Sequence, residues 1–208
     1  MKKLFAIILV VALLFSFTAC GKKDEPKKEF SRGVVTGSTY ENEFLGLGMK
    51  FDESWVFLSD EEIAALYGYT NELLGDDFEE YLKNATVIYD MYAQSTATSC
   101  SVNINFEKLS ALGSVQTANM EVFVSSVMPT VVDSLESAGC SNVTYELCDI
   151  KIGDKTFEGS TLSAELMGVK LYQVLVCIKC DGYIANISIA SPLTDSTQSI
   201  IDCFYVLD

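Results

Sequence analysis

The sequence of 208 residues contains no histidine, one tryptophan and three prolines. Without histidine, the chain lacks the commonest general base and the commonest side-chain metal ligand of proteins. A serine nucleophile activated by histidine is excluded, and the G-x-S-x-G motif is absent as well. Neither a phosphate-binding loop nor a G-x-G-x-x-G motif occurs. Carboxylates and thiols are the candidate reactive groups considered below.

Basic residues are scarce in the larger, C-terminal part of the chain. From Val34 onward, 7 Lys and Arg stand against 26 Asp and Glu, a formal charge of −19. Such a surface repels nucleic acid and anionic lipid, so no nucleic-acid partner is expected. High net charge is an ordinary means of keeping a domain soluble. The alternative is a cationic ligand or a basic protein or peptide partner.

The N-terminal residues predict a signal peptide over residues 1–19. Two lysines precede an apolar run from Leu4 to Phe15, and small residues follow. The apolar run is too short for a stable membrane-spanning helix. The segment Phe17–Gly21 (FTACG) resembles the lipobox of bacterial lipoproteins, in which the cysteine is lipidated and becomes the new N-terminus. This resemblance implies lipid attachment at Cys20 and an extracytoplasmic protein anchored to the bacterial cell membrane.

A polar segment follows the lipobox. Residues 21–32 (GKKDEPKKEFSR) are mostly charged and include Pro26, a composition typical of an unstructured tether. Fully extended, this segment spans only about 40 Å, which keeps the domain near the membrane. The rest of the chain suits one domain with a hydrophobic core. The expected organisation is a signal peptide (1–19), a lipidated N-terminus with a flexible tether (20–33) and a single domain (34–208).

Strand signals dominate the domain. Strands are expected at residues 34–40, 45–51, 54–58, 87–96, 101–109, 143–152, 155–165, 169–180 and 183–190. Both alternate sets of residues in strand 169–180 are mostly apolar, which predicts a central strand that is covered on both faces. Asp181-Gly182 is a two-residue hairpin signal before the last of these strands.

Helices are expected between and after the strands. A capping box of Ser59 and Glu62 begins a helix that runs towards Leu74, and a short helix is expected at 77–84. A longer helix is expected at 117–138, where Pro129 predicts a kink or two abutting helices. A last helix is expected from Thr194 or Asp195 to about residue 205. The simplest packing is an α+β fold in which an antiparallel β-sheet is sandwiched between helices.

The order of these elements resembles the PsbP/Mog1-like fold, which recurs in small secreted lipoproteins. The resemblance rests on Glu43–Phe51 (EFLGLGMKF), Trp55, the helix capped by Ser59, the mid-chain helix, the hairpin Ile152–Phe157 (IGDKTF), Tyr172 and Gly182-Tyr183. It covers nearly all of residues 34–208 and implies an α/β/α sandwich. The family includes accessory and scaffolding subunits, so the resemblance implies a fold rather than one activity.

Six cysteines follow Cys20, at positions 100, 140, 148, 177, 180 and 203. In an exported protein they allow three disulfides with 15 possible connectivities. We expect buried thiols instead, because a domain of this size does not need covalent cross-links. Cys177 and Cys180 form a C-x-x-C motif, but redox motifs of this kind need a helix N-terminus. Here the motif lies in an expected strand, where residues three apart point to opposite faces.

Two acidic clusters have competing explanations. Asp76, Asp77, Glu79 and Glu80 suggest calcium, but the D-x-D-x-D-G pattern is absent and the first turn of a helix explains them. Residues 60–62 suggest acid–base chemistry, and the capping box explains them as well. A zinc site at the C-x-x-C motif needs Cys140 and Cys148, whose separation is too wide for structural zinc. We therefore expect no catalytic residue, cofactor or metal ion.

The favoured function is a non-catalytic binding or accessory module on a membrane-anchored, extracytoplasmic lipoprotein. A first alternative is a cell-envelope hydrolase that uses carboxylates alone, which requires two carboxylates facing one cleft. A second alternative is a transporter-associated solute-binding protein, although such proteins are normally two-lobed. A pocket with converging carboxylates discriminates between these possibilities.

Overall fold

The computed structural model describes residues 28–67, 85–110, 113 and 117–207. The segment expected to be a signal peptide (1–19), Cys20, the acidic cluster at 76–80 and the helix expected at 77–84 lie outside these residues. The strands are β1 (Val34–Thr36), β2 (Thr39–Asn42), β3 (Leu47–Lys50), β4 (Trp55–Phe57), β5 (Val87–Ser95), β6 (Ser101–Lys108), β7 (Cys140–Ile152), β8 (Lys155–Leu166), β9 (Val169–Cys180), β10 (Tyr183–Pro192) and β11 (Phe204–Val206). The helices are α2 (Asp60–Leu66), α5 (Met120–Ser137) and α6 (Thr197–Ile201).

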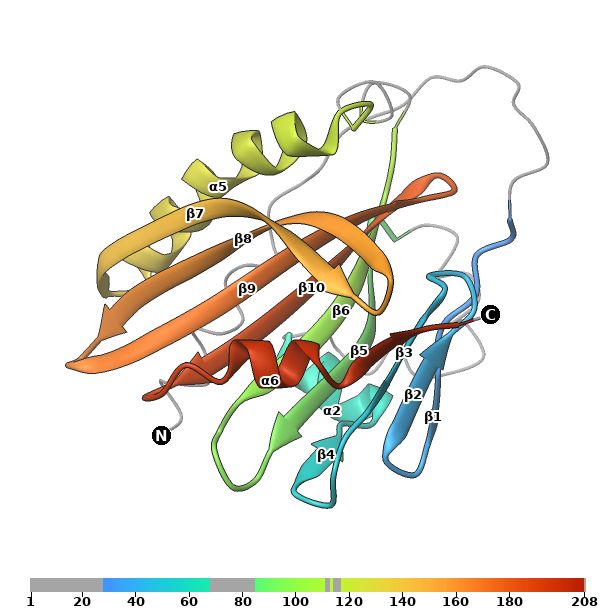
Figure 1. Cartoon of the computed structure of the whole chain (residues 1–208), viewed down its shortest axis with the longest axis horizontal. Coiled ribbons are helices and arrows are strands. Elements are labelled where there is room, and N and C mark those ends of the chain that lie inside the picture. The colour runs from blue at the N-terminus through green and yellow to red at the C-terminus, as the bar shows by residue number, and fades with distance from the viewer. Residues whose placement is uncertain (1–27, 68–84, 111–112, 114–116, 208) are drawn as a thin grey trace.

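The strands form two antiparallel sheets. The large sheet has the order β4-β5-β6-β10-β9-β8-β7, and the small sheet has the order β1-β2-β3-β11. Figure 1 shows α5 along one face of the large sheet, while α6 and the small sheet lie towards the other. This arrangement confirms the α+β fold with helices on both faces of an antiparallel sheet. The small sheet on one of those faces is an addition that the sequence did not predict.

Tight turns connect the four longest strands. Met167 and Gly168 both have positive φ (51° and 80°), as a type I′ hairpin turn requires. Gly182 (φ 80°) follows Asp181 at the predicted β9–β10 turn. The meander from β7 to β10 was therefore predicted from the sequence to within a few residues at each end.

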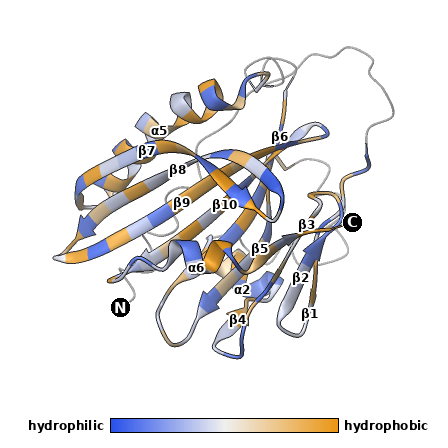
Figure 2. Cartoon of the chain, viewed as in Figure 1, coloured by the Kyte–Doolittle hydropathy of each residue, from blue (hydrophilic) through white to orange (hydrophobic). Residues whose placement is uncertain are grey.

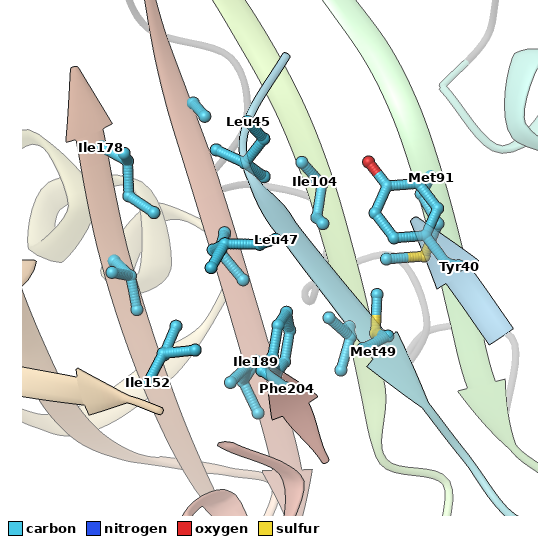
Figure 3. Packing of buried hydrophobic residues seen from close by; sticks show 14 of the residues in the cluster. Tyr40, Leu45, Leu47, Met49, Met91, Ile104, Ile152, Ile178, Ile189 and Phe204 are labelled. Atoms are coloured by element: carbon cyan, nitrogen blue, oxygen red, sulfur yellow. The ribbon is translucent and has the colours of Figure 1, made fainter. Parts of the chain in front are cut away.

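Strand β9 is covered on both faces, as predicted. Val174, Val176 and Ile178 join the core between the two sheets, whereas Leu175 and Cys177 pack beneath α5. Figure 3 shows Leu47 and Met49 of the small sheet among Ile104, Ile178 and Ile189 of the large sheet. The two cores place β9 in the middle of a three-layered domain.

Helix α5 is an amphipathic helix that begins later than expected. Asn119 caps it by accepting a 3.0 Å hydrogen bond from the Val122 amide. Figure 2 shows hydrophobic residues interspersed with hydrophilic ones along the helix. The buried side consists of Val124, Val127, Met128, Val131 and Leu135. Pro129 lies inside one continuous helix, so the alternative of two abutting helices is wrong. Among the described residues, no helix combines the length and apolar composition needed to cross a bilayer.

Two expectations for the chain ends of the domain are wrong. The last helix does not reach residue 205, because Phe204 is buried and pairs with Met49 to add β11 to the small sheet. The expected strand 34–40 is a hairpin, because Gly37 (φ 61°) turns the chain between β1 and β2. Both errors concern the small sheet, in which β1, β2 and β3 pair locally while β11 joins β3 from the far end of the chain.

The capping box at the start of α2 is confirmed. The Glu62 amide donates to Ser59 Oγ at 3.3 Å, and the Ser59 amide donates to Glu62 Oε2 at 2.8 Å. The helix lies against β5, where the ring of Tyr67 stacks on Tyr89 with centroids 3.7 Å apart. The carboxylates of residues 60–62 thus occupy the first helical turn, as predicted. One of them, Asp60, has a second role described below.

Candidate functional site

A half-open cleft, here called the β7–β9 cleft, lies on the polar end of the large sheet beside the start of α6. Its volume is about 290 Å³. Side chains with hydroxyl groups are the commonest type in its lining. The lining residues are Thr144, Tyr145, Glu146, Thr161, Leu162, Ser163, Tyr172, Gln173, Asp195 and Thr197. This volume is near the lower end of the range of small-molecule pockets, so the cleft has room for a small ligand or for one unit of a larger ligand.

Strand register explains why the polar side chains meet. Thr144 pairs with Ser163, which in turn pairs with Tyr172, and Glu146 pairs with Thr161. Paired residues of neighbouring strands project from the same face of a sheet. The hydroxyls of Thr144 and Ser163 are accordingly hydrogen-bonded at 2.8 Å. The result is a row of hydroxyls beside a tyrosine and a carboxylate.

The second carboxylate of the cleft comes from the loop before α6. Asp195 Oδ1 accepts hydrogen bonds from the Thr197 amide (3.0 Å) and the Thr197 hydroxyl (2.7 Å). These bonds fix the carboxylate at the first turn of α6, although the structure assigns the N-cap position itself to Ser196. Within the described chain, neither Asp195 Oδ2 nor the exposed carboxylate of Glu146 has a protein hydrogen bond. The cleft therefore presents two carboxylates with unused acceptor capacity.

Sequence reasoning did not identify this cleft. In the sequence, Asp195 is recognisable only as a candidate helix cap, and no local pattern distinguishes Glu146. The alternation of Thr161, Ser163 and Glu165 with apolar residues in the expected strand 155–165 was the available signal. That pattern indicates a polar face, but the approach of the loop before α6 depends on tertiary packing.

A second polar assembly, here called the Asp90 hub, joins the two sheets. Asp90 is the extra residue of a β-bulge between Tyr89 and Met91, and the bulge directs its side chain towards the small sheet. The carboxylate accepts hydrogen bonds from Arg32 Nε (3.2 Å), the Gly33 amide (3.1 Å), Asn42 Nδ2 (2.8 Å) and the Tyr40 hydroxyl. Asp90 is 5% exposed. All this acceptor capacity is used within the protein.

Arg32 extends the hub to helix α2. Its Nη1 and Nη2 atoms contact the two carboxylate oxygens of Asp60 at 3.0 and 2.7 Å, and Nη2 also donates to the Asp90 carbonyl at 2.9 Å. Burial, followed by the charge of Asp90, raises the pKa of Tyr40 well above its ordinary value. The phenol therefore stays protonated and donates to Asp90 throughout the physiological range. A hollow of about 280 Å³ borders the hub, but the charged groups that line it are already paired with one another.

Arg32 belongs to a docked segment, here called the strap (Lys28–Gly33). Its Phe30 ring lies 5.2 Å from the rings of Phe44 and Phe106 and 4.8 Å from the Tyr183 ring. The Lys28 amide donates to Asp181 at 3.0 Å. The strap falls within the segment 20–33 that was expected to be a flexible tether. Because residues 28–33 contact the domain, they are part of it, and a flexible tether could extend only as far as residue 27.

A buried polar row crosses the middle of the large sheet on the face opposite the small sheet. Asn186 Nδ2 donates to Asn105 Oδ1 at 3.2 Å, and Cys177 Sγ contacts Asn186 Oδ1 at 3.4 Å. Asn103 is 4% exposed, and its Oδ1 has no partner within the described residues. Burial raises the pKa of Glu107 to about 8. In sequence, these residues alternate with apolar ones, and the structure buries Asn103, Asn105 and Glu107 and partly buries Asn186.

The six cysteines of the domain are free thiols. Cys177 packs beneath α5 and Cys180 packs against the core between the sheets, so the C-x-x-C motif lies in a strand with its thiols on opposite faces, as predicted. Burial, followed by the charge of Glu107, raises the pKa of Cys177 to about 12. Burial, followed by the charge of Asp181, raises the pKa of Cys180 to about 11. Protonated thiols are poor nucleophiles and poor metal ligands.

Comparisons with known proteins reveal similar structures but no sequence family. No family model and no curated protein matches the chain. Cyanobacterial PsbP (CyanoP) of Synechocystis sp. PCC 6803 is similar with a TM-score of 0.49 and 10% identity, over 86% of this chain and 98% of CyanoP. A protein from Bacteroides thetaiotaomicron has a TM-score of 0.42 and 11% identity, over 84% of this chain and 50% of its own. LpqN of Mycobacterium tuberculosis, involved in cell envelope biogenesis, has a TM-score of 0.37 and 9% identity, over 78% of this chain and 83% of LpqN.

Proposed function

We propose that this protein is a membrane-anchored, extracytoplasmic lipoprotein whose domain acts as a non-catalytic binding or accessory module. The β7–β9 cleft carries the binding part of the proposal, because it is open and its carboxylates have unused hydrogen-bonding capacity. The signal peptide and the lipobox-like segment Phe17–Gly21 support the location. In the mature protein, lipid on Cys20 anchors the chain to the membrane. Because the strap is docked on the domain, the length of residues 21–27 sets the greatest distance between the domain and the membrane.

The anchor is tested by replacing Cys20 with alanine. Two or more acyl chains give stable membrane attachment where a single chain does not. Wild-type protein is expected in the membrane fraction with incorporated radiolabelled fatty acid, whereas the variant is released or remains unprocessed. A wild-type protein that stays in the membrane without fatty acid contradicts lipid anchoring.

A carboxylate-dependent hydrolase is the second candidate, favoured by one observation. Glu146 and Asp195 line the same cleft, which is the arrangement that acid–base hydrolysis of glycosides needs. Two features favour binding instead. Glu146 is exposed, whereas a general acid is usually made by burial, and Asp195 is held by Thr197.

A panel of cell-wall glycan substrates separates the two candidates. The binding module predicts no turnover by the wild type above that of the Glu146→Gln variant. Reproducible hydrolysis that disappears in both Glu146→Gln and Asp195→Asn contradicts the non-catalytic proposal and supports the hydrolase.

A further inference from the structure

We propose that the β7–β9 cleft recognises a protonated primary amine on a ligand that also carries hydroxyl or amide groups. This inference rests on the proposed function as a binding module and names the chemistry that the module selects. The ammonium group lies between the carboxylates of Glu146 and Asp195, and neighbouring polar atoms of the ligand contact the row of hydroxyls.

The charge of the lining sets the sign of the ligand. Among the residues that the structure describes, the lining of the cleft includes two carboxylates and neither lysine nor arginine. Phosphates, sulfates and carboxylates are therefore repelled at close range, since none of these lining residues supplies a cation to pair with them. The formal charge of −19 from Val34 onward attracts cations at longer range. A cationic ligand gains from both effects.

The available acceptors match an ammonium group. Asp195 uses Oδ1 for Thr197, which leaves Oδ2 as an acceptor, and Glu146 contributes a carboxylate with no protein hydrogen bond in the described chain. An ammonium group donates three hydrogen bonds, and charge-assisted bonds are stronger than neutral ones. The Tyr172 ring adds a surface that attracts cations through its π-electrons.

The hydroxyl row adds a second requirement. Thr144, Thr161 and Ser163 offer both donors and acceptors on one face of the sheet. With a simple alkylamine, the row of hydroxyls is hydrogen-bonded only to water. An amino sugar or a peptide with a lysine side chain has further polar atoms that form hydrogen bonds with the row. Amino sugars and lysine-bearing peptides share the proposed chemistry, so the experiment compares them directly.

The test is a titration of the full-length protein with three probes at low and high salt, followed by NMR chemical shifts or calorimetry. The probes are a glucosamine trimer, an N-acetylglucosamine trimer and a trilysine peptide. The two sugars share their rings and differ in charge. At least one amine probe is expected to bind at least ten-fold more tightly than the acetylated trimer, with an affinity that falls as salt increases. The stronger of the two amine probes identifies the source of the amine.

Two variants locate the binding site. Glu146→Gln removes one charge from the cleft and is expected to weaken binding of the amine probe by about five-fold or more. Asp149→Asn is the matched control, because Asp149 is exposed on the same strand but alternates onto the opposite face. Its affinity is expected to stay within two-fold of the wild type.

Three results overturn the inference. The first is equal binding of the acetylated and amine-bearing trimers. This result agrees with a binding module but contradicts recognition of the amine. The second is no binding of either amine probe. The third is an equal loss of affinity in Asp149→Asn and Glu146→Gln, which reveals attraction by overall charge alone. None of these results affects lipid anchoring of Cys20, which the fatty-acid experiment tests separately.

Discussion

The Asp90 hub and the β7–β9 cleft contain the same kinds of groups, but the protein uses the hydrogen-bond acceptors of the hub carboxylate and leaves those of the cleft carboxylates largely unused. Each includes carboxylates and hydroxyls, and each borders a hollow of similar size, about 280 and 290 Å³ respectively. In the hub, the buried Asp90 accepts hydrogen bonds from four residues on two segments of the chain, the strap and β2. In the cleft, Glu146 is exposed and has no protein partner within the described residues.

This difference separates a structural role from a binding role. A buried carboxylate whose acceptors are all used stabilises the fold, and removing it leaves its partners unpaired. An exposed carboxylate in an open cleft contributes little to stability and keeps its capacity for a ligand. The number of carboxylates in a region therefore says less about function than the fraction of their acceptors that the protein itself uses.

The largest expected effect is on the hub. Asp90→Ala leaves Arg32, Tyr40 and Asn42 without their shared acceptor, so the free energy of unfolding is expected to fall by about 3–5 kcal/mol. Urea denaturation followed by circular dichroism measures this change. Asp149→Ala is the control and is expected to change the free energy by less than about 0.5 kcal/mol. A loss below about 1 kcal/mol in Asp90→Ala is incompatible with a structural hub.

The strap gives the next largest effect. Phe30→Ala removes a ring from the cluster of Phe44, Phe106 and Tyr183, and we expect a loss of about 2 kcal/mol because Phe30 is only partly buried. The freed strap exposes the bonds after Lys28 and Arg32 to trypsin. Limited proteolysis is therefore expected to remove the segment faster than in the wild type.

Phe30→Leu is the matched control for the strap, since it keeps apolar contact in the aromatic cluster. It is expected to lie between wild type and Phe30→Ala in both stability and cleavage rate. If Phe30→Ala is cleaved no faster than the wild type, the strap is not held by these aromatic contacts.

The sequence predicted the large sheet well and the small sheet poorly. The meander β7–β10 has local turn signals, and Ser59 and Glu62 marked the start of α2. By contrast, β11 pairs with β3 across most of the chain length. No local pattern distinguishes its few residues from the end of a helix, so the pairing depends on the assembled core.

The candidate sites depended even more on tertiary structure. Asp90 was an unremarkable residue of an expected strand, and only the bulge and the docked strap make it the centre of a network. Asp195 lines the same cleft as Glu146 because α6 packs against β9 and β10. The placement of Cys177 and Cys180 was predictable, because strand alternation is a local property of the backbone.

Glu107 gives an intermediate effect that depends on pH. Its pKa rises from the ordinary 4.5 to about 8 in the folded protein, because burial disfavours the charged form. The stabilising contribution is complete below pH 4.5 and is lost as the pH rises towards 8 and above. Glu107→Gln cannot ionise, so we expect it to exceed the wild type in stability at pH 9 by on the order of 1–3 kcal/mol.

Denaturation at pH 5, 7 and 9 checks this prediction. At pH 5 the wild type and Glu107→Gln are expected to differ by less than at pH 9. Glu121→Gln, on the exposed surface of α5, serves as the control for the loss of one carboxylate. Parallel stability curves for the wild type and Glu107→Gln across this range contradict a buried, neutral Glu107.

The smallest expected effect on stability lies in the cleft. Thr161→Ala removes an exposed hydroxyl of the row and its hydrogen bond to the half-buried Cys148 thiol, so the free energy of unfolding is expected to fall by less than about 1 kcal/mol. Binding of the amine probe is expected to weaken. Ser160→Ala, at the buried neighbouring position beneath α5, provides the contrasting variant, with the larger change expected in stability.

The most direct test applies one chemical change to both regions. Asp90→Asn and Glu146→Gln each replace a carboxylate with its amide, and both variants are measured for urea stability and for affinity towards the preferred amine probe. We predict that Asp90→Asn loses stability while the folded protein keeps its affinity, and that Glu146→Gln keeps stability and loses about five-fold or more in affinity. A Glu146→Gln variant that loses stability but binds as the wild type does would contradict the assignment of the cleft as the binding site.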